Sequence, residues 1–333
     1  MANRLVGTKG ARPWLDVFSY GRQSPSQSLR FSAEQLEQIA RTVQGVPEAF
    51  VKVSRSGRSV GQVKDLIGYL GREGELAIET DAGVSLRGPG VRKFLAEDWD
   101  LKLEALRAHR WIDGKRGSKR PNMVFHLMFS SAAGTPPQKV LAAARKFAQE
   151  KFARQQRYAM VLHTDRKNPH VHMLVKLMGV NGVKLITTKA TLRQWRHDYA
   201  QNLRELGIAA NATDRAVRGE TRSRMKDGIY RAALLGKSTY VRKHVEGVAA
   251  ELLRGGVVVE KGKARVMESR KVVERGWMVI AEALDNQGQH ALAADVRRFV
   301  GRMPAPMTGK EQIAHQLMQH VRARTRDREG PVR

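Results

Sequence analysis

Residues 163–172, His-Thr-Asp-Arg-Lys-Asn-Pro-His-Val-His, place three histidines and one aspartate within ten positions. Apolar runs flank this segment on both sides, Tyr158–Leu162 before it and Met173–Val175 after it. Short apolar runs with β-branched residues are typical of strands, and a turn containing the proline allows two strands to fold together. Side chains alternate along a strand, so His170 and His172 share a face. The segment therefore predicts an antiparallel hairpin on which three imidazoles converge.

Three converging imidazoles form a donor set for a first-row divalent metal ion. Imidazole ligands favour manganese, nickel or zinc, whereas phosphate oxygens of a substrate would add hard ligands that suit magnesium. A structural zinc site usually takes a fourth ligand such as Cys, and the chain has no cysteine. We therefore expect a catalytic metal site with an open position on His163, His170 and His172. Asp165 is expected to orient a histidine or to accept a proton, with an exposed turn aspartate as the alternative.

The charge balance indicates the kind of partner. The chain carries 60 Lys and Arg residues against 32 Asp and Glu residues, a formal net charge of +28. Such a field attracts polyanions, with nucleic acid as the usual partner and an anionic membrane surface as the alternative.

No apolar run reaches the roughly 18 residues of a spanning helix, and Met1–Trp14 lacks a secretory signal, so we expect no membrane insertion. The lack of cysteine excludes thiolate chemistry and fits a cytosolic protein. No His-Glu-x-x-His motif occurs, which argues against a zinc protease.

The residue pattern divides the chain into three regions. Residues 1–45 are interpreted as an N-terminal extension, with little periodicity up to about residue 30 and a helical spacing that begins after an expected N-cap at Ser32. Residues 46–222 alternate strand and helix patterns, which predicts an α+β domain with a central antiparallel sheet and flanking helices. Within it we expect a helix over 91–109 and a strand near 183–186. Residues 223–333 are basic and are expected to form a separate, mainly helical C-terminal region.

A metal site that acts on a nucleic acid needs a nucleophile, either metal-bound water or a side chain. The chain offers six tyrosines and no cysteine. Tyr69 is flanked by Gly68 and Gly71, which leaves space for a substrate to approach. Tyr158 and Tyr199 fit apolar patterns and are interpreted as packing residues.

Three motifs, in this order, resemble the P-type mobilisation family of conjugative relaxases, which are tyrosine nucleases of the HUH group. Residues 69–76, Tyr-Leu-Gly-Arg-Glu-Gly-Glu-Leu, resemble the catalytic-tyrosine motif of that family. Residues 129–135, Phe-Ser-Ser-Ala-Ala-Gly-Thr, resemble the motif that holds DNA beside the nick. Residues 163–172 resemble its metal motif. With further similarity downstream, the resemblance covers about residues 48–222.

The resemblance implies site- and strand-specific nicking and rejoining of single-stranded DNA at an origin of transfer. Tyr69 would attack the scissile phosphate to give a 5′-phosphotyrosyl intermediate, with manganese or magnesium in use and zinc or nickel as alternatives. The tyrosine of the family usually lies close to the N-terminus, so Tyr20 is the alternative nucleophile.

The resemblance also implies where the protein acts and with which partners. It implies a cytoplasmic bacterial enzyme that pilots DNA in conjugation and is exported with it to the recipient cell. The expected partners are an accessory DNA-binding protein and the coupling protein of a type IV secretion system. The Arg-rich stretch 322–328 resembles export signals of that system, and a nonspecific DNA-binding tail explains it equally well.

Binding a DNA strand needs groups beyond the metal ligands. The resemblance implies hydroxyl contacts, and two basic clusters are candidates for phosphate contacts, with a solvated charged surface as the alternative. The residues expected to contact DNA are Ser130, Thr135, Arg72, Lys115, Arg116, Lys119, Arg120, Arg215 and Arg218. Trp111 and Trp195 are candidates for base stacking, although tryptophan is more often a core residue.

Two alternatives to a tyrosine relaxase remain open. One is a nuclease that uses metal-bound water at the same site and forms no covalent intermediate. The other is a basic DNA-binding accessory protein without catalytic activity.

Overall fold

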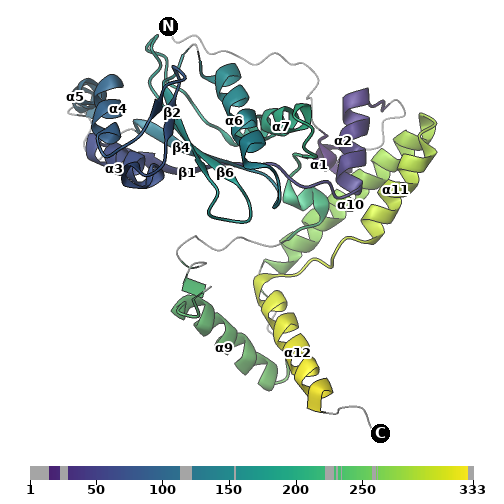
Figure 1. Ribbon diagram of the computed structural model, residues 1–333. Coiled ribbons are helices and arrows are strands. Elements are labelled where there is room, and N and C mark those ends of the chain that lie inside the picture. The colour runs from purple at the N-terminus through teal and green to yellow at the C-terminus, as the bar shows by residue number, and fades with distance from the viewer. Residues whose placement is uncertain are drawn as a thin grey trace. The chain divides into compact units, whose positions relative to one another are not determined.

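The computed structural model (Figure 1) describes residues 15–22, 29–112, 122–153, 155–221, 229, 232–233, 235–256, 260 and 262–328. The chain forms two compact units. One unit is residues 45–212, and the other combines residues 1–44 with residues 213–333. The predicted extension and C-terminal region thus contribute to one helical unit, while the boundary at 44–45 lies where the sequence pattern changes.

The unit of residues 45–212 is built on a six-stranded sheet with the order β1-β4-β6-β5-β2-β3. Every hydrogen-bonded pair of neighbouring strands is antiparallel. This arrangement confirms the predicted α+β class with a central antiparallel sheet. The strands are β1 (Phe50–Gly57), β2 (Ile78–Thr80), β3 (Ser85–Leu86), β4 (Val124–Ser130), β5 (Tyr158–His163) and β6 (His170–Lys176).

The predicted histidine hairpin is present as β5 and β6. His163 pairs with His170 at its closed end, and Tyr158 pairs with Val175 at its open end. Strand β6 lies inside the sheet, where β4 pairs with its other edge and places Ser130 opposite His170. The first six residues of β6 are buried, as expected for a central strand covered on both faces.

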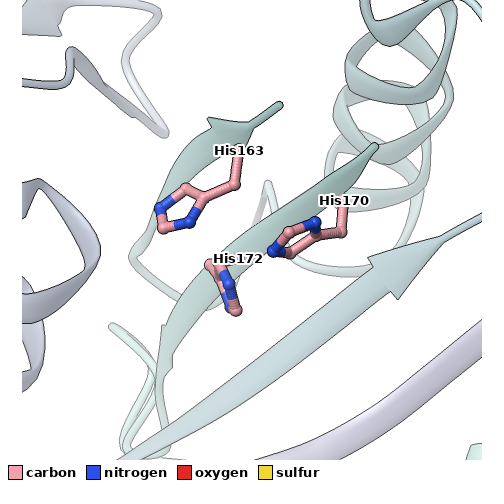
Figure 2. Close-up of side chains that lie close together, drawn as sticks. All are labelled: His163, His170 and His172. Carbon is pink, nitrogen blue, oxygen red and sulfur yellow. The ribbon is translucent and has the colours of Figure 1, made fainter. Parts of the chain in front are cut away.

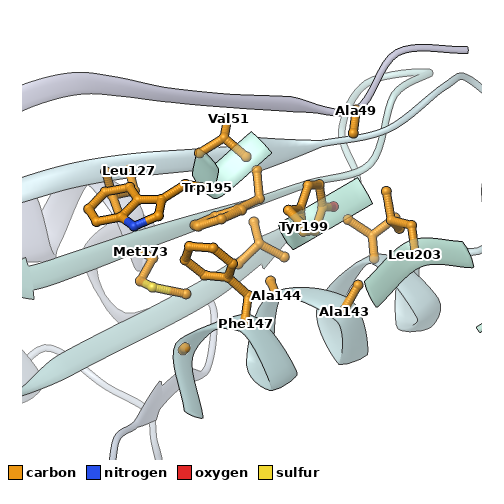
Figure 3. Close-up of a cluster of buried hydrophobic side chains, with 14 of the residues drawn as sticks. Ala49, Val51, Leu127, Ala143, Ala144, Phe147, Met173, Trp195, Tyr199 and Leu203 are labelled. Carbon is orange, nitrogen blue, oxygen red and sulfur yellow. The ribbon is translucent and has the colours of Figure 1, made fainter. Parts of the chain in front are cut away.

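Helices cover both faces of the sheet. On one face, α6 (Pro137–Lys151) and α7 (Lys189–Glu205) enclose a core that includes Phe129, Phe147 and Trp195 (Figure 3). Helices α3 (Val60–Leu70), α4 (Val91–Asp98) and α5 (Leu101–Ile112) belong to the other face. Its core includes Leu174, Val161 and Val124, with Val63, Ile67 and Leu95 from the helices.

Strand alternation assigns the histidines to one of these two faces. Leu174 and Val161 face the core under α3 and α4. His170 and His172 share the parity of Leu174, and His163 shares that of Val161, so all three rings belong to the same face. Tyr69 lies on α3, the helix that packs against this face.

Two predicted elements differ from the structure. The helix expected over 91–109 is divided into α4 and α5, because Trp99 is buried and Asp100 adopts a positive φ of 50° that ends the first helix. The strand expected near 183–186 is absent among the described residues, where an isolated bridge joins Met178 to Lys184. Val183 is 58% and Ile186 is 72% exposed, whereas Leu185 packs against the core, so the segment buries little of its apolar surface.

The second unit is helical, as predicted for the C-terminal region. Helix α1 (Val17–Arg22) crosses α10 (Lys263–Asn286) at two glycines. A Cβ atom on Gly21 would lie 1.9 Å from the Val272 carbonyl oxygen, and one on Gly276 would lie 2.1 Å from that of Val17. Only glycine permits so close a backbone approach. Helices α2 (Ala33–Val43) and α11 (His290–Gly301) complete this core around Trp277.

Two further helices of this unit, α9 (Thr239–Leu253) and α12 (Gly309–Arg328), pack on each other. Lys310 at the start of α12 contacts Glu251 of α9 at 2.6 Å. Across the described residues, we find no helix with the length and hydropathy that crossing a membrane requires.

Candidate metal centre and nucleophile

The three predicted histidine ligands lie together at the closed end of the hairpin (Figure 2). Within the described part of the chain they form one cluster, in which a ligand nitrogen from each ring lies within 4.8 Å of the others. The ring centroids are 4.5 Å apart for His163 and His172, 4.9 Å for His170 and His172, and 5.3 Å for His163 and His170. All three side chains are buried. The strand register thus creates the convergence that the sequence predicts.

Each imidazole uses one ring nitrogen in an internal hydrogen bond. The Nε2–H of His163 donates to the Leu70 carbonyl at 2.8 Å, and the Nδ1–H of His170 donates to the Asn168 carbonyl at 3.1 Å. A carbonyl oxygen only accepts, so the opposite nitrogen of each ring keeps its lone pair. The Nδ1 of His172 lies 2.7 Å from the Nε2 of His126. His163 and His170 therefore each offer one imidazole lone pair to a metal ion. His172 offers a third lone pair, on Nε2, when its ring hydrogen is on Nδ1.

Two of the ligand histidines are held neutral. Burial lowers the pKa of His172 to about 2, and repulsion from the neighbouring imidazoles contributes further. Burial also lowers the pKa of His170, and His163 adds to this effect, although the Asn168 carbonyl opposes it. A neutral imidazole is the form that binds a metal ion. The donor set, its neutrality and its burial fit a first-row divalent cation.

Tyr69 lies in the last turn of α3. Ser59 caps this helix by accepting the backbone N–H of Gln62, and the apolar positions Val63, Ile67 and Leu70 pack toward the sheet. Tyr69 itself is 47% exposed. Since His163 binds the carbonyl of Leu70, the peptide immediately after Tyr69 is attached to the histidine cluster. The structure thus joins the predicted nucleophile segment to the predicted metal segment.

The turn after Tyr69 has an unusual backbone. Arg72 and Glu73 both have a positive φ, 49° and 53°, and Gly74 follows at 102°. A Cβ on Gly74 would lie 2.4 Å from the backbone carbon of Gly88, so glycine is required there. The guanidinium Nη2 of Arg72 lies 2.8 Å from Asp165 Oδ2, which ties this turn to the loop between β5 and β6.

Asp165 is predicted to orient a histidine or to accept a proton, and its pKa and its ion pair bear on both roles. Burial alone would raise its pKa, but a hydrogen bond from its own backbone lowers it, and Arg72, His170 and His163 add to that lowering. The net result is a pKa below the usual range. The carboxylate pairs with Arg72, whereas the ring nitrogens of the three histidines bond to two backbone carbonyls and to His126.

The two hydroxyls expected to contact DNA lie at the end of β4, which Ser130 ends, and in the turn that follows it, which contains Thr135. Ser130 Oγ donates to the Pro169 carbonyl at 3.2 Å, and Thr135 Oγ1 donates to the Ala132 carbonyl at 2.8 Å. Asn168 Nδ2 also donates to the Ser131 carbonyl at 3.0 Å. The bonds of Ser130 and Asn168 attach the second motif to the loop that precedes His170.

The remaining predicted contact residues are not part of this cluster. Lys115, Arg116, Lys119 and Arg120 lie outside the described residues. Arg218, in the 3-10 helix η2 (Arg215–Arg218) of the helical unit, donates to the Thr213 carbonyl at 2.9 Å and to Glu220 at 2.9 Å. Arg215 faces Glu220 at 4.0 Å. Both cations therefore have internal partners in the structure.

The structure places the two base-stacking candidates and the alternative nucleophile Tyr20 in different surroundings. Trp195 is 5% exposed and belongs to the core, whereas the side chain of Trp111 lies outside the described residues. Tyr20 lies in the helical unit, where its ring packs against Phe31. Burial raises the pKa of Tyr20, and Asp16 raises it further, so its surroundings favour a neutral phenol. Residues 322–328 form the end of α12.

Sequence reasoning missed His126, which lies on β4 beside the cluster. It is 2% exposed and hydrogen-bonded to His172. The available signal was the alternation of β4, which puts His126 on the same face as Val124. Using that signal requires knowing that β4 pairs with β6, a contact between segments 46 residues apart.

Strands β4, β5 and β6, with the histidine cluster, lie in a segment that is similar to a family of nucleases. Residues 91–208 match the family model described as relaxase, MobA/VirD2-like, nuclease domain. The matched range contains His163, His170, His172 and Ser130, while Tyr69 precedes it. The match confirms the predicted resemblance to the relaxases over residues 91–208.

Two similar proteins extend this comparison. The T-DNA border endonuclease VirD2 of Rhizobium radiobacter is 25% identical over 175 residues, which are 49% of this chain and 40% of that protein. The chain therefore spans less than half the length of this relative. A solved structure titled "Molecular Basis of Vancomycin Resistance Transfer in Staphylococcus aureus" aligns over 51% of this chain and 99% of its own, with 13% identity and a TM-score of 0.33. A similarity of that size carries no argument about the fold.

Proposed function

We propose that this chain nicks and rejoins one DNA strand at an origin of transfer, with Tyr69 as the nucleophile. The observation that carries the proposal is the hydrogen bond between His163 and the Leu70 carbonyl, because it attaches the residue after Tyr69 to the three-histidine cluster. The match to a relaxase nuclease domain supports the same reaction class. The formal net charge of +28 supports a polyanionic substrate.

The reaction is a transesterification. Tyr69 Oη forms a bond to the scissile phosphorus while the bond from phosphorus to the 3′ oxygen breaks. The released strand leaves with a 3′-hydroxyl after its oxygen takes up a proton, and the other strand end stays attached as a 5′-phosphotyrosine. A divalent ion held by His163, His170 and His172, manganese or magnesium in use, would neutralise charge on the phosphate. One phosphodiester replaces another, so the reverse reaction rejoins the strand without ATP.

The phenol must lose its proton as it attacks the phosphate. Asp165 has a lowered pKa and pairs with Arg72, which makes it a weak proton acceptor. We therefore place Asp165 as a positioning residue that acts through Arg72 on the turn after Tyr69. Hydroxide or a buffer base that reaches the half-exposed phenol would take the proton, and a divalent ion held by the three histidines would favour its loss.

Contacts to the DNA backbone complete the proposal. Ser130 and Thr135 lie in the segment bonded to the metal loop, and Arg72 lies on the turn after Tyr69. The basic segment with Lys115, Arg116, Lys119 and Arg120, together with Arg215 and Arg218, would track phosphates. As in the conjugative relaxases it resembles, the chain would act in the bacterial cytoplasm with an accessory DNA-binding protein and a type IV coupling protein. It would then pilot the DNA to the recipient cell.

A denaturing gel tests the nucleophile. Labelled single-stranded oligonucleotides that tile the DNA around the gene are incubated with Mn²⁺ or Mg²⁺ and with wild type, Tyr69→Phe or Tyr20→Phe protein. We expect a denaturant-resistant adduct that only Tyr69→Phe loses. Free cleaved ends that persist in Tyr69→Phe would instead support the metal-water nuclease. Tight binding without cleavage under any metal would support the non-catalytic accessory protein.

A further inference from the structure

We propose that His126 is a positioning residue that fixes His172 in its metal-binding tautomer and adds no charge to the centre. The inference rests on the proposed metal site. It starts from the hydrogen bond between His126 Nε2 and His172 Nδ1, at 2.7 Å, with the two ring centroids 4.8 Å apart. Both residues are buried, so water does not replace this bond.

The sheet register explains why the two rings meet. Strand β4 pairs with β6 so that Met128 lies opposite His172 and His126 lies opposite Leu174. His126 is therefore the diagonal neighbour of His172 on the same face, within reach of a ring side chain. This pairing belongs to the rigid centre of the sheet, so the position of His126 does not depend on a loop.

Only one arrangement of protons in this pair is compatible with a metal ion. If His126 Nε2 carried the hydrogen, it would donate to His172 Nδ1, and a neutral His172 would then carry its own hydrogen on Nε2. That hydrogen would block the nitrogen that faces the cluster. If His172 Nδ1 carries the hydrogen and donates to His126, then His172 Nε2 keeps its lone pair. His126 thus acts as the acceptor that selects the ligand tautomer.

The chemistry of His126 also sets the charge of the centre. Metal-bound histidines often donate to a carboxylate, which adds negative charge and raises the basicity of the ligand. Here His163 and His170 donate to carbonyls, His172 donates to an imidazole, and the Asp165 carboxylate is paired with Arg72. A bound cation therefore keeps its full positive charge for an anionic phosphodiester.

Metal titration of variants tests this role. In glutamine, the side-chain oxygen occupies about the place of His Nε2, whereas in asparagine it occupies about the place of His Nδ1. We expect His126→Gln to retain the Mn²⁺ affinity of wild type and His126→Asn to weaken it roughly 10- to 100-fold, as measured by calorimetry. His315→Gln, a change at an exposed histidine of α12, is the matched control and leaves the affinity unchanged. Thermal unfolding without metal verifies that each variant is folded.

A charged variant separates the two parts of the proposal. His126→Glu places a carboxylate at the acceptor position, so it should bind Mn²⁺ more tightly and, with the metal saturated, bind a single-stranded oligonucleotide more weakly than His126→Gln. Equal Mn²⁺ affinities for folded Gln and Asn variants would overturn the role of His126. Wild-type protein that binds no Mn²⁺ at all would instead overturn the proposed metal site on which the inference rests.

Discussion

At the scale of single residues, Tyr199 illustrates the free-energy cost of burying a hydroxyl group in a hydrophobic core. It is fully buried and packs edge-on against Phe129 at 5.1 Å between ring centroids. Within the part of the chain that the structure describes, its hydroxyl has no hydrogen-bond partner. Burial raises the pKa of this phenol far above its ordinary value, so the group stays neutral.

Tyr199→Phe is therefore expected to leave the protein as stable as wild type or to stabilise it. The change keeps the ring contact and removes an unsatisfied hydroxyl, whose burial costs about 1–3 kcal/mol. Urea unfolding measures the difference in the free energy of unfolding. Tyr199→Ala is the comparison, because loss of the ring should cost about 3–5 kcal/mol. A clear loss of stability in Tyr199→Phe would show that the hydroxyl has a partner such as a buried water.

At the scale of elements, the ion pair between Arg72 and Asp165 joins the turn after α3 to the hairpin loop. Both side chains are about 40% exposed, so the pair contributes only about 0–1 kcal/mol to stability. We expect Arg72→Gln and Asp165→Asn to leave the unfolding temperature nearly unchanged and to slow adduct formation by Tyr69. The double variant should be no slower than the slower single variant, because both changes break one contact.

The pH profile of the adduct rate distinguishes this role from general-base catalysis. Protonation of Asp165 breaks the ion pair with Arg72 and would also remove a general base, so wild type loses rate at low pH under either role. If Asp165 positions the turn, this acidic limb disappears in Arg72→Gln as it does in Asp165→Asn. An acidic limb that is kept in Arg72→Gln, or effects of the two single changes that simply add, would show that Asp165 does not act through Arg72.

The histidine hairpin could be predicted because all of the residues that form it are close together in the sequence. Its two strands, its turn and its three imidazoles lie within residues 158–176, and alternation alone puts His170 and His172 on one face. His126 could not be predicted in the same way, because its role depends on pairing between β4 and β6. The division of the helix expected over 91–109 was missed because the burial of Trp99, a tertiary effect, outweighed the helical pattern.

At the scale of the whole molecule, the two compact units have separate cores. The sheet unit encloses one core on each face, and the helical unit has its own core around Trp277. We therefore expect a fragment of residues 45–212 to fold alone and to bind Mn²⁺ with the affinity of the full chain. Circular dichroism and calorimetry on the fragment check this expectation. A fragment that unfolds, or that binds the metal far more weakly, would show that the helical unit supports the site.

The contact of α1 with α10 has a consequence for how the protein is made. Helix α1 leaves the ribosome early, yet the surface that its Gly21 packs against belongs to residues 263–286. The sheet unit lies between them in the chain, and its two ends already meet, since the Ala49 N–H donates to the Asn211 carbonyl at 2.8 Å. The sheet unit is thus an insertion that can close on itself during translation, whereas α1 can form its contact only after α10 is synthesised, more than 200 residues later.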